Sequence, residues 1–273
     1  MMFIVPVLAA AVGAASLAPE ARAQDSSQWQ KDSHSAVRLV AGSRSGAVLL
    51  GGIAFQLQPG WHTYWRNPGD SGVSPRFDFS RSDNVETVTV LWPAPMKFDD
   101  GAGGTALGYI RQVVLPLRIV AKNTDRPVTL RADINYAVCE KLCIPVEASA
   151  ELAFNSVAST EDASLFAALD TVPKPANIGD ANPLTIRDVR REGKTVLVDV
   201  VAPDPGKVEL FAEGPTPDWA LPVPKPLAHG PPGVKRFAFD LDGVPPGASV
   251  DGAALKLTLV GDERAYEFNV NLN

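Results

Sequence analysis

Residues 128–154, VTLRADINYAVCEKLCIPVEASAELAF, carry the clearest structural signal of this 273-residue chain. Val128–Val138 is a strand-sized segment that leads straight into Cys139, and Val146–Phe154 leads away from Cys143. A disulfide requires Cα atoms about 4.4–6.8 Å apart. Both a hairpin and a single helical turn satisfy this requirement at the observed spacing, and the strand pattern on either side favours the hairpin. We therefore predict two strands that turn back on each other and bring the cysteines together.

The rest of the N-terminal half also divides into strand-sized segments and turns. Ala47–Leu57 is an apolar strand interrupted by Gly51-Gly52, which predicts a β-bulge there. Pro59-Gly60 is a turn signal, and Trp61–Trp65 alternates as a half-buried strand does. Two further strands are expected at Val85–Trp92 and Gln112–Ala121. The 24 prolines and 22 glycines of the chain occur without a period, which suits short strands joined by turns and predicts a β-sandwich.

The C-terminal half repeats this pattern after one helix. Ser159–Leu169 predicts a helix that Ser159 caps together with Asp162, with an apolar face that includes Leu165 and Phe166. A second set of alternating strands follows at Leu184–Arg190, Thr195–Val201, Val208–Phe211, Arg236–Leu241, Leu255–Val260 and Ala265–Val270. Proline-rich loops separate these strands, so a second sandwich is expected.

We therefore expect an all-β protein made of two β-sandwich domains joined by a short helix. The predicted boundaries are residues 24–157 for the first sandwich, 158–178 for the helical and proline-rich linker, and 179–273 for the second sandwich. The second half has no cysteine and no obvious cluster of reactive side chains. We expect it to be a structural or docking domain, and we look for chemistry in the first.

Residues 1–23 have the pattern of a secretory signal peptide. Phe3–Leu17 is an apolar run that no Lys or Arg precedes, and Ala21-Arg22-Ala23 predicts cleavage before Gln24. The run is shorter than the roughly 20 residues needed to span a bilayer, and no later stretch is long enough, so we expect an exported protein without stable membrane insertion. Export allows a disulfide to persist. The formal charge of −6, without a basic stripe, argues against a nucleic-acid partner.

Cys139 and Cys143 are the only cysteines of the chain, and they allow three kinds of site. A structural disulfide across so short a loop would contribute only about 2 kcal/mol on the entropic account. A metal site would use the two thiolates as soft ligands. In a thiol–disulfide exchange site, the interpretation we favour, one thiolate attacks a partner's disulfide and the other resolves the mixed disulfide. Lys141 would favour a thiolate and Glu140 would oppose it, so local charge does not select the attacking sulfur.

Short motifs in a fixed order cover residues 40–155. They are Pro59–Trp65 followed by Asn67–Gly72, then Trp92–Pro95, Gly108-Tyr109, Leu115–Leu117 and Cys139–Glu147. Taken together, these motifs resemble the N-terminal periplasmic domain of the DsbD family of thiol:disulfide reductases, and more closely its ScsB branch from the copper-sensitivity-suppressor system. The resemblance implies an immunoglobulin-like sandwich whose catalytic pair, Cys139 and Cys143, shuttles electrons.

The resemblance also implies partners. In the family, a membrane-embedded domain and a thioredoxin-like domain reduce the cysteine pair, which then reduces a periplasmic thioredoxin-fold protein. The sequence contains neither membrane helices nor a thioredoxin-like C-x-x-C segment, so we expect a stand-alone periplasmic module without a cofactor, whose donor is a separate membrane-embedded thiol reductase. Aromatic side chains of a neighbouring loop shield the pair in the family, and Phe98 and Tyr109 are the candidates here. The cysteine spacing is longer in DsbD, so its detailed site geometry does not transfer, and the direction of electron flow stays open.

Two rival functions remain open beside this protein-disulfide reductase-type relay. One is a copper(I)-handling protein that uses the same thiolates, since a C-x-x-x-C followed by a histidine resembles Sco-type copper carriers. Those carriers have a βαβ scaffold, which this sequence does not predict. The other is a binding module whose disulfide is structural. His62 is expected to be an ordinary strand residue beside aromatic side chains, and Tyr64 and Trp65 to be core or edge aromatics without a ligand-binding role.

Overall fold

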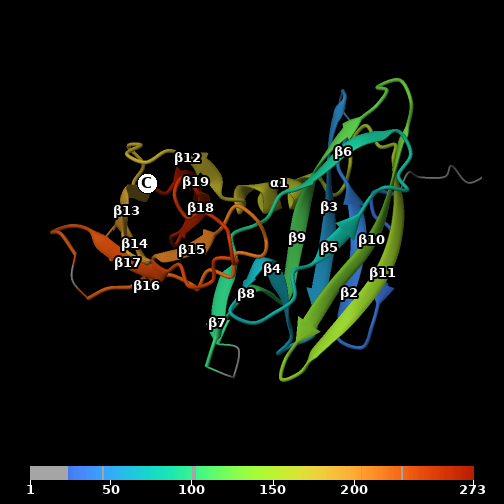
Figure 1. Ribbon diagram of the computed structural model, residues 1–273. Helices are drawn as coiled ribbons and strands as arrows, with labels where there is room; N and C mark the ends of the chain where they lie inside the picture. Colours follow the sequence, from blue (N-terminus) through green and yellow to red (C-terminus); the bar gives the residue numbers. More distant parts are fainter. Residues whose placement is uncertain (1–23, 45, 100–102, 204, 229) are drawn as a thin grey trace, which may run out of the picture.

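The computed structural model describes residues 24–44, 46–99, 103–203, 205–228 and 230–273. The predicted signal peptide, residues 1–23, lies outside the described residues. The described chain forms two β-sandwiches joined by one short helix, α1 (Asp162–Asp170) (Figure 1). This architecture confirms the predicted all-β, immunoglobulin-like class. No helix within the described ranges is both long and apolar enough to cross a bilayer.

The N-terminal sandwich, as we call the first of the two, consists of the two sheets built from β1 to β11. Its first sheet has the strand order β1 (Gln30–Lys31), β2 (Ser35–Ala41), β3 (Val48–Leu57), β9 (Gln112–Ala121) and β6 (Val85–Val90). Its second sheet has the order β11 (Cys143–Phe154), β10 (Val128–Cys139), β4 (His62–Gly69), β8 (Thr105–Ile110) and β7 (Met96–Asp99), with β5 (Arg76–Asp78) paired to β10. Large side chains such as Leu39, Ile53, Trp65 and Phe154 are fully buried in its core.

The C-terminal sandwich contains the remaining strands. One sheet has the order β12 (Lys174–Ala176), β19 (Ala265–Asn271), β18 (Ala254–Val260) and β15 (Glu209–Glu213). The other has the order β13 (Thr185–Glu192), β14 (Thr195–Val201), β17 (Lys235–Asp240) and β16 (Lys225–Pro226). In β19 the buried residues Tyr266, Phe268 and Val270 alternate with less buried ones, and these side chains belong to the core between the sheets.

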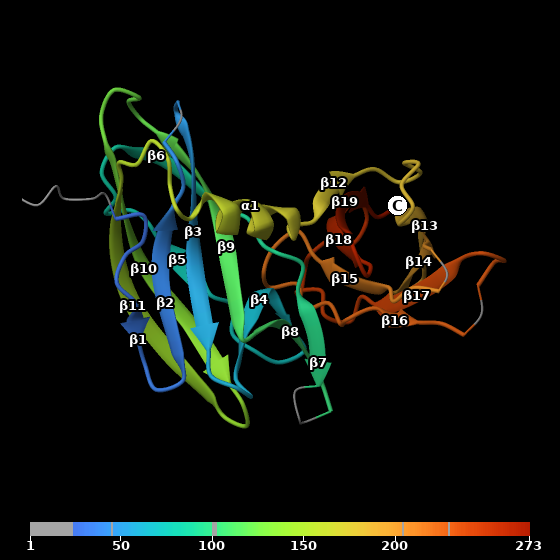
Figure 2. The same ribbon diagram turned by 180° about the vertical axis from the view of Figure 1, so that it is seen from behind.

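The two sandwiches share part of one core. Phe211 of β15 and Val223 come from the C-terminal half, yet both belong to the apolar cluster of the N-terminal sandwich. Phe211 is 1% exposed. Strands β4, β8 and β7 lie on the side of the N-terminal sandwich that faces the C-terminal one, with α1 bridging the two (Figure 2). The sandwiches are therefore packed against each other and not merely tethered by the linker.

The predicted bulge at Gly51-Gly52 is wrong. Both glycines keep a continuous register with β9, Gly51 opposite Leu117 and Gly52 opposite Pro116. A Cβ on Gly51 would lie 2.8 Å from the ring of Phe154, and one on Gly52 would lie 2.9 Å from Leu165 of α1. The glycines are there because neighbouring side chains approach the backbone closely on both faces of β3.

The helix exists, but its predicted cap is wrong, and its predicted apolar face is confirmed at Leu165 and wrong at Phe166. The capping residue is Glu161, without a side-chain cap, and the Asp162 carboxylate accepts hydrogen bonds from the backbone N–H and the hydroxyl of Ser43 instead. Leu165 is buried against the N-terminal sandwich, whereas Phe166 is 59% exposed. The tertiary contact with Ser43 therefore outweighs the local capping preference.

Candidate functional site

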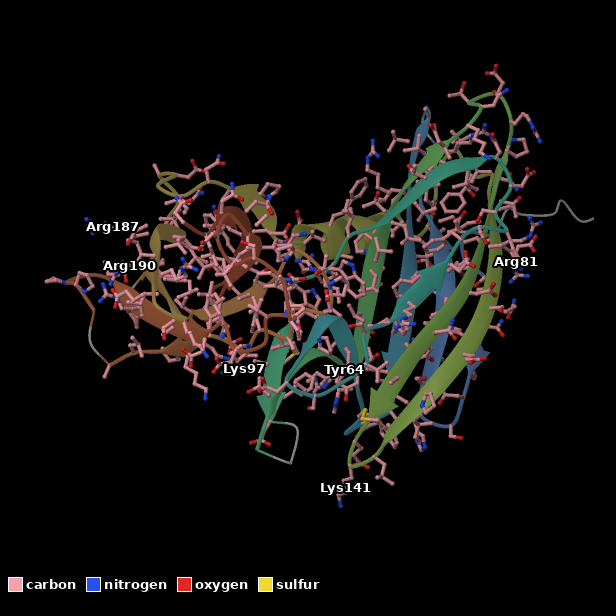
Figure 3. All side chains as sticks on the ribbon, in the orientation of Figure 1. Tyr64, Arg81, Lys97, Lys141, Arg187 and Arg190 are labelled. Atoms are coloured by element: carbon pink, nitrogen blue, oxygen red, sulfur yellow. A yellow bond between two sulfur atoms is a disulfide. The ribbon has the colours of Figure 1, made fainter. Side chains whose placement is uncertain are left out.

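Cys139 and Cys143 form a disulfide at the end of the β10–β11 hairpin. Cys139 is the last residue of β10, Cys143 is the first of β11, and the two are direct Cα partners 4.2 Å apart. The hairpin predicted from the flanking strands is confirmed. Figure 3 shows the sulfur atoms just above the turn that carries Lys141.

The two cysteines have different environments. Cys139 is 3% exposed, whereas Cys143 is an exposed residue. The connecting residues Glu140–Leu142 are exposed as well, and Leu142 is 78% exposed. A partner can therefore approach the pair from the Cys143 side, while Cys139 is covered by the protein.

The Tyr64 hydroxyl contacts both sulfur atoms. It donates a hydrogen bond to Cys139 Sγ at 2.8 Å and lies 3.2 Å from Cys143 Sγ. The strand register explains this placement, because His62 is the Cα partner of Cys139, and Tyr64, two residues further along β4, lies on the same face of the sheet. The sequence predicted a core or edge aromatic at Tyr64, and the residue is 3% exposed, but nothing in the sequence predicted its contact with the sulfurs.

An aromatic group covers this face beside the disulfide. The rings of His62 and Tyr64 meet edge to face at 5.3 Å, and Phe98 of β7 lies 4.5 Å from His62. Phe98 also packs against the small apolar cluster that contains Tyr64 and Cys139. Burial lowers the pKa of the His62 imidazole, so the neutral form is favoured at this position. His62 is a strand residue beside aromatics, as predicted.

Of the two shielding residues considered, Phe98 lies at the site and Tyr109 does not. Tyr109 is buried in the core of the N-terminal sandwich, and its hydroxyl donates a hydrogen bond to the Pro93 carbonyl at 2.8 Å. Burial raises its pKa well above the usual value. Tyr109 is adjacent in sequence to Gly108, which faces the site, but alternation along β8 turns its side chain to the opposite face.

Two glycines allow β4 to be covered on its outer face. A Cβ on Gly108 would lie 1.9 Å from the Thr63 carbonyl oxygen, and one on Gly72 would lie 2.5 Å from the Tyr64 ring. Gly72 has a φ of 144°, which disfavours other residues. The prediction that Trp61–Trp65 is half-buried is therefore wrong from Thr63 onward, since the core covers one face and the Gly72 loop covers the other.

The charged residues between the cysteines do not select a sulfur. Lys141 extends from the hairpin tip away from the sulfur atoms (Figure 3). Glu140 packs against the turn at Gly60, where an added Cβ would lie 2.9 Å from the carboxylate oxygen. The donor that reaches Cys139 is therefore the Tyr64 hydroxyl, a residue 75 positions away in the sequence.

No metal cluster is apparent in the described part of the chain. Among those residues, no group of three or more His, Cys, Asp or Glu side chains is placed to hold a metal ion. His62 contacts Tyr64 and Phe98, and His34 stacks on Trp61 with ring centroids 3.8 Å apart.

Comparisons with known proteins bear on the family and the fold. Residues 33–155 match the family described as thiol:disulfide interchange protein DsbD, N-terminal. The crystal structure of the N-terminal periplasmic domain of ScsB from Proteus mirabilis matches with a TM-score of 0.73 at 23% identity, over 91% of this chain and 98% of that one. At this identity the match shows a shared fold.

Two further comparisons found no informative similarity. A conserved domain protein from Bacillus anthracis aligns at a TM-score of only 0.26 and 10% identity, over 85% of this chain and 75% of that one. No curated protein matches the chain significantly. The predicted resemblance is thus confirmed over residues 33–155, which match the DsbD N-terminal family, and the described chain shares the fold of the ScsB N-terminal periplasmic domain.

Proposed function

We propose that this protein is a periplasmic redox relay, in which the Cys139–Cys143 pair passes reducing equivalents from a membrane-embedded or thioredoxin-like thiol donor to a thioredoxin-fold acceptor. The family match points to thiol–disulfide interchange in general. The periplasmic location is supported by the signal-like N-terminus and by the shared fold with the periplasmic domain of ScsB. One observation carries the proposal: an exposed Cys143 is bonded to a buried Cys139 whose sulfur accepts a hydrogen bond.

Exposure assigns different roles to the two sulfurs. The donor's thiolate attacks Cys143 Sγ, the S–S bond breaks, and Cys139 leaves as a thiolate. The donor's second thiolate then attacks the donor's first sulfur, which is bonded to Cys143 in the mixed disulfide. This step releases Cys143 as a thiolate and leaves the donor as a disulfide. Two electrons have moved to this protein, and solvent protons complete the thiols. The same steps in reverse reduce a disulfide of the acceptor.

Tyr64 assists the bond-breaking step. Its hydroxyl donates to Cys139 Sγ, the atom that gains negative charge when Cys143 is attacked. A hydrogen bond to a charged acceptor is stronger than one to a neutral acceptor, so this contact strengthens as the bond breaks. Tyr64 thereby stabilises the leaving thiolate inside a pocket that would otherwise disfavour charge.

Trapping with single cysteine variants tests the relay. Cys139→Ser leaves Cys143 to attack a partner but removes the resolving sulfur, so a mixed disulfide should accumulate in the periplasm. Cys143→Ser is the matched variant, and it should trap far less because Cys139 is buried. A thioredoxin-fold protein captured by Cys139→Ser supports the proposal. If neither variant captures one, the relay is wrong and the disulfide is a structural feature.

A further inference from the structure

The pairing of strand β4 with β8 is interrupted next to the redox site. Strand β4 pairs with β8 from His62 to Tyr64, and its register with β8 then breaks before Gly69. Tyr64, whose hydroxyl contacts both sulfurs, is thus the last residue of the regular pairing. The position of its backbone beyond that point depends on other contacts.

The next three residues of β4 are held by the C-terminal sandwich. The Trp65 ring packs on Phe211 with centroids 5.9 Å apart. The Asn67 side-chain amide donates a hydrogen bond to the Ala212 carbonyl at 3.1 Å. Between them, the Arg66 guanidinium reaches two carboxylates of the same sandwich. All three residues after Tyr64 therefore anchor β4 on strands of the C-terminal half.

The Arg66 contacts form the strongest of these anchors. Its Nε and Nη2 donate to the two carboxylate oxygens of Glu213, at 2.9 and 2.7 Å, and Nη2 lies 2.5 Å from Glu267 Oε2. The three side chains are only 18–22% exposed. Burial by itself lowers the pKa of Arg66, but the hydrogen bonds and charges of both glutamates raise it. A bidentate pair of this kind fixes orientation as well as distance.

A second connection runs from Arg66 to the Tyr64 ring. The Ser74 hydroxyl donates a hydrogen bond to the Arg66 carbonyl at 2.9 Å. Ser74 belongs to the same loop as Gly72, whose backbone lies so close to the Tyr64 ring that an added Cβ would be 2.5 Å from it. Movement of Arg66 would therefore shift both the strand that carries Tyr64 and the loop that backs its ring.

We infer that Arg66 is a positioning residue and that the C-terminal sandwich, through Glu213 and Glu267, holds the Tyr64 hydroxyl against the disulfide. The inference rests on the proposed function for its purpose, since a positioned hydroxyl matters only if the bond is opened and closed. It assigns the C-terminal sandwich a share in the exchange reaction, although that sandwich has no cysteine of its own.

The test compares two ways of weakening ion pairs in the C-terminal sandwich. Glu213→Gln with Glu267→Gln loosens Arg66. Asp199→Asn instead removes a bidentate pair with Arg236, at 2.6 and 2.8 Å, between β14 and β17, which belong to the other sheet of the C-terminal sandwich. The second-order rate of disulfide reduction by dithiothreitol is the readout. The double variant should be slowed about threefold to tenfold, in the lower part of the range for coupled neighbours, and Asp199→Asn should match the wild type.

The same variants in a Tyr64→Phe background separate positioning from general loosening. If the glutamates act through the Tyr64 hydroxyl, their replacement should change the rate little once that hydroxyl is gone. An equal slowing in both backgrounds, or none in either, overturns the inference. Arg66→Lys, which keeps the charge but loses the fork, should be intermediate, and it replaces the double variant if circular dichroism shows that the double variant is unfolded. Dithiothreitol needs no protein partner, so failure here is distinct from failure of the trapping experiment.

Discussion

At the scale of single residues, the site depends on the different environments of its two cysteines. Cys143 is open to a partner, while Cys139 is buried and accepts the hydrogen bond of Tyr64. The buried sulfur must carry a charge when the bond opens, and burial alone would make that charge costly. In the proposed relay, the Tyr64 hydroxyl therefore stabilises the charge that forms on Cys139 when the bond opens.

Tyr64→Phe should slow reduction of the disulfide by dithiothreitol about tenfold, which corresponds to the loss of one hydrogen bond to a charged sulfur. Tyr109→Phe is the matched control, because it removes an equally buried hydroxyl that bonds to the Pro93 carbonyl. The control rate should equal that of the wild type. Equal rates for all three proteins would show that Tyr64 only fills space.

His62 should make the stability depend on pH. Its pKa is lowered from the usual 6.5 by burial, so the unfolded chain binds a proton at a higher pH than the folded one. The contribution of His62 to the free energy of unfolding is therefore fully present above about pH 6.5, and it is lost progressively as the pH falls below that value. Urea unfolding at a series of pH values should show a smaller acid loss for His62→Gln than for the wild type. Parallel curves for the two proteins would contradict this.

At the scale of elements, the sequence was informative where the pattern was local. Val128–Val138 and Val146–Phe154 predicted the hairpin because each segment carries its own strand pattern and the cysteines fix the connection. The bulge at Gly51-Gly52 failed because the reason for these glycines is Phe154, about 100 positions away in the chain. The predicted cap at Ser159 is wrong for a similar reason, because Asp162 hydrogen-bonds to Ser43, which is also distant in the sequence. Close contacts between distant segments leave no trace in local periodicity.

The side chains that cover the disulfide could not be predicted either, because they come from segments that are distant in the sequence. Tyr64, Phe98 and Gly72 stand on β4, β7 and a loop, and only the strand register brings them to one face with Cys139. The motif around Trp61–Trp65 contributed to the family resemblance, but the sequence did not predict that this strand lies beside the disulfide. Which of its side chains reaches the sulfur depends on the pairing of His62 with Cys139, which the sequence does not specify.

Gly72→Ala should slow the exchange by pushing on the Tyr64 ring, whereas Gly233→Ala should not. Both glycines have positive φ, at 144° and 74°, so both replacements should cost stability on the order of 1 kcal/mol. A Cβ on Gly233 would meet no atom within 4 Å, whereas one on Gly72 would meet the ring. Thermal unfolding and dithiothreitol rates of both variants check this. Equal rates would mean that the Gly72 loop does not position Tyr64.

At the scale of the whole molecule, the two sandwiches behave as one packed body in which the second supports the site of the first. The sequence predicted the second sandwich from its strands but attributed to it only a structural or docking role. Its contribution comes from Phe211, Glu213 and Glu267, three ordinary strand residues whose contacts with β4 become visible only in the folded chain.

Phe211→Ala should therefore destabilise the whole protein. Phe211 is fully buried in the core of the N-terminal sandwich, so its loss should cost about 3–5 kcal/mol. Urea unfolding should remain a single transition at a lower midpoint. Phe166→Ala removes a 59% exposed ring and should change stability by less than about 0.5 kcal/mol. Two separate transitions, only one of them shifted, would show that the sandwiches unfold independently.

In the proposed relay, the disulfide between Cys139 and Cys143 is reduced and re-formed in each cycle. Equilibration of the purified protein with glutathione buffers tests this most directly, with the thiol content followed by alkylation. We expect a reduction potential between about −180 and −270 mV, within the range of thiol–disulfide exchange proteins. A potential well below about −300 mV, typical of structural disulfides, would contradict it.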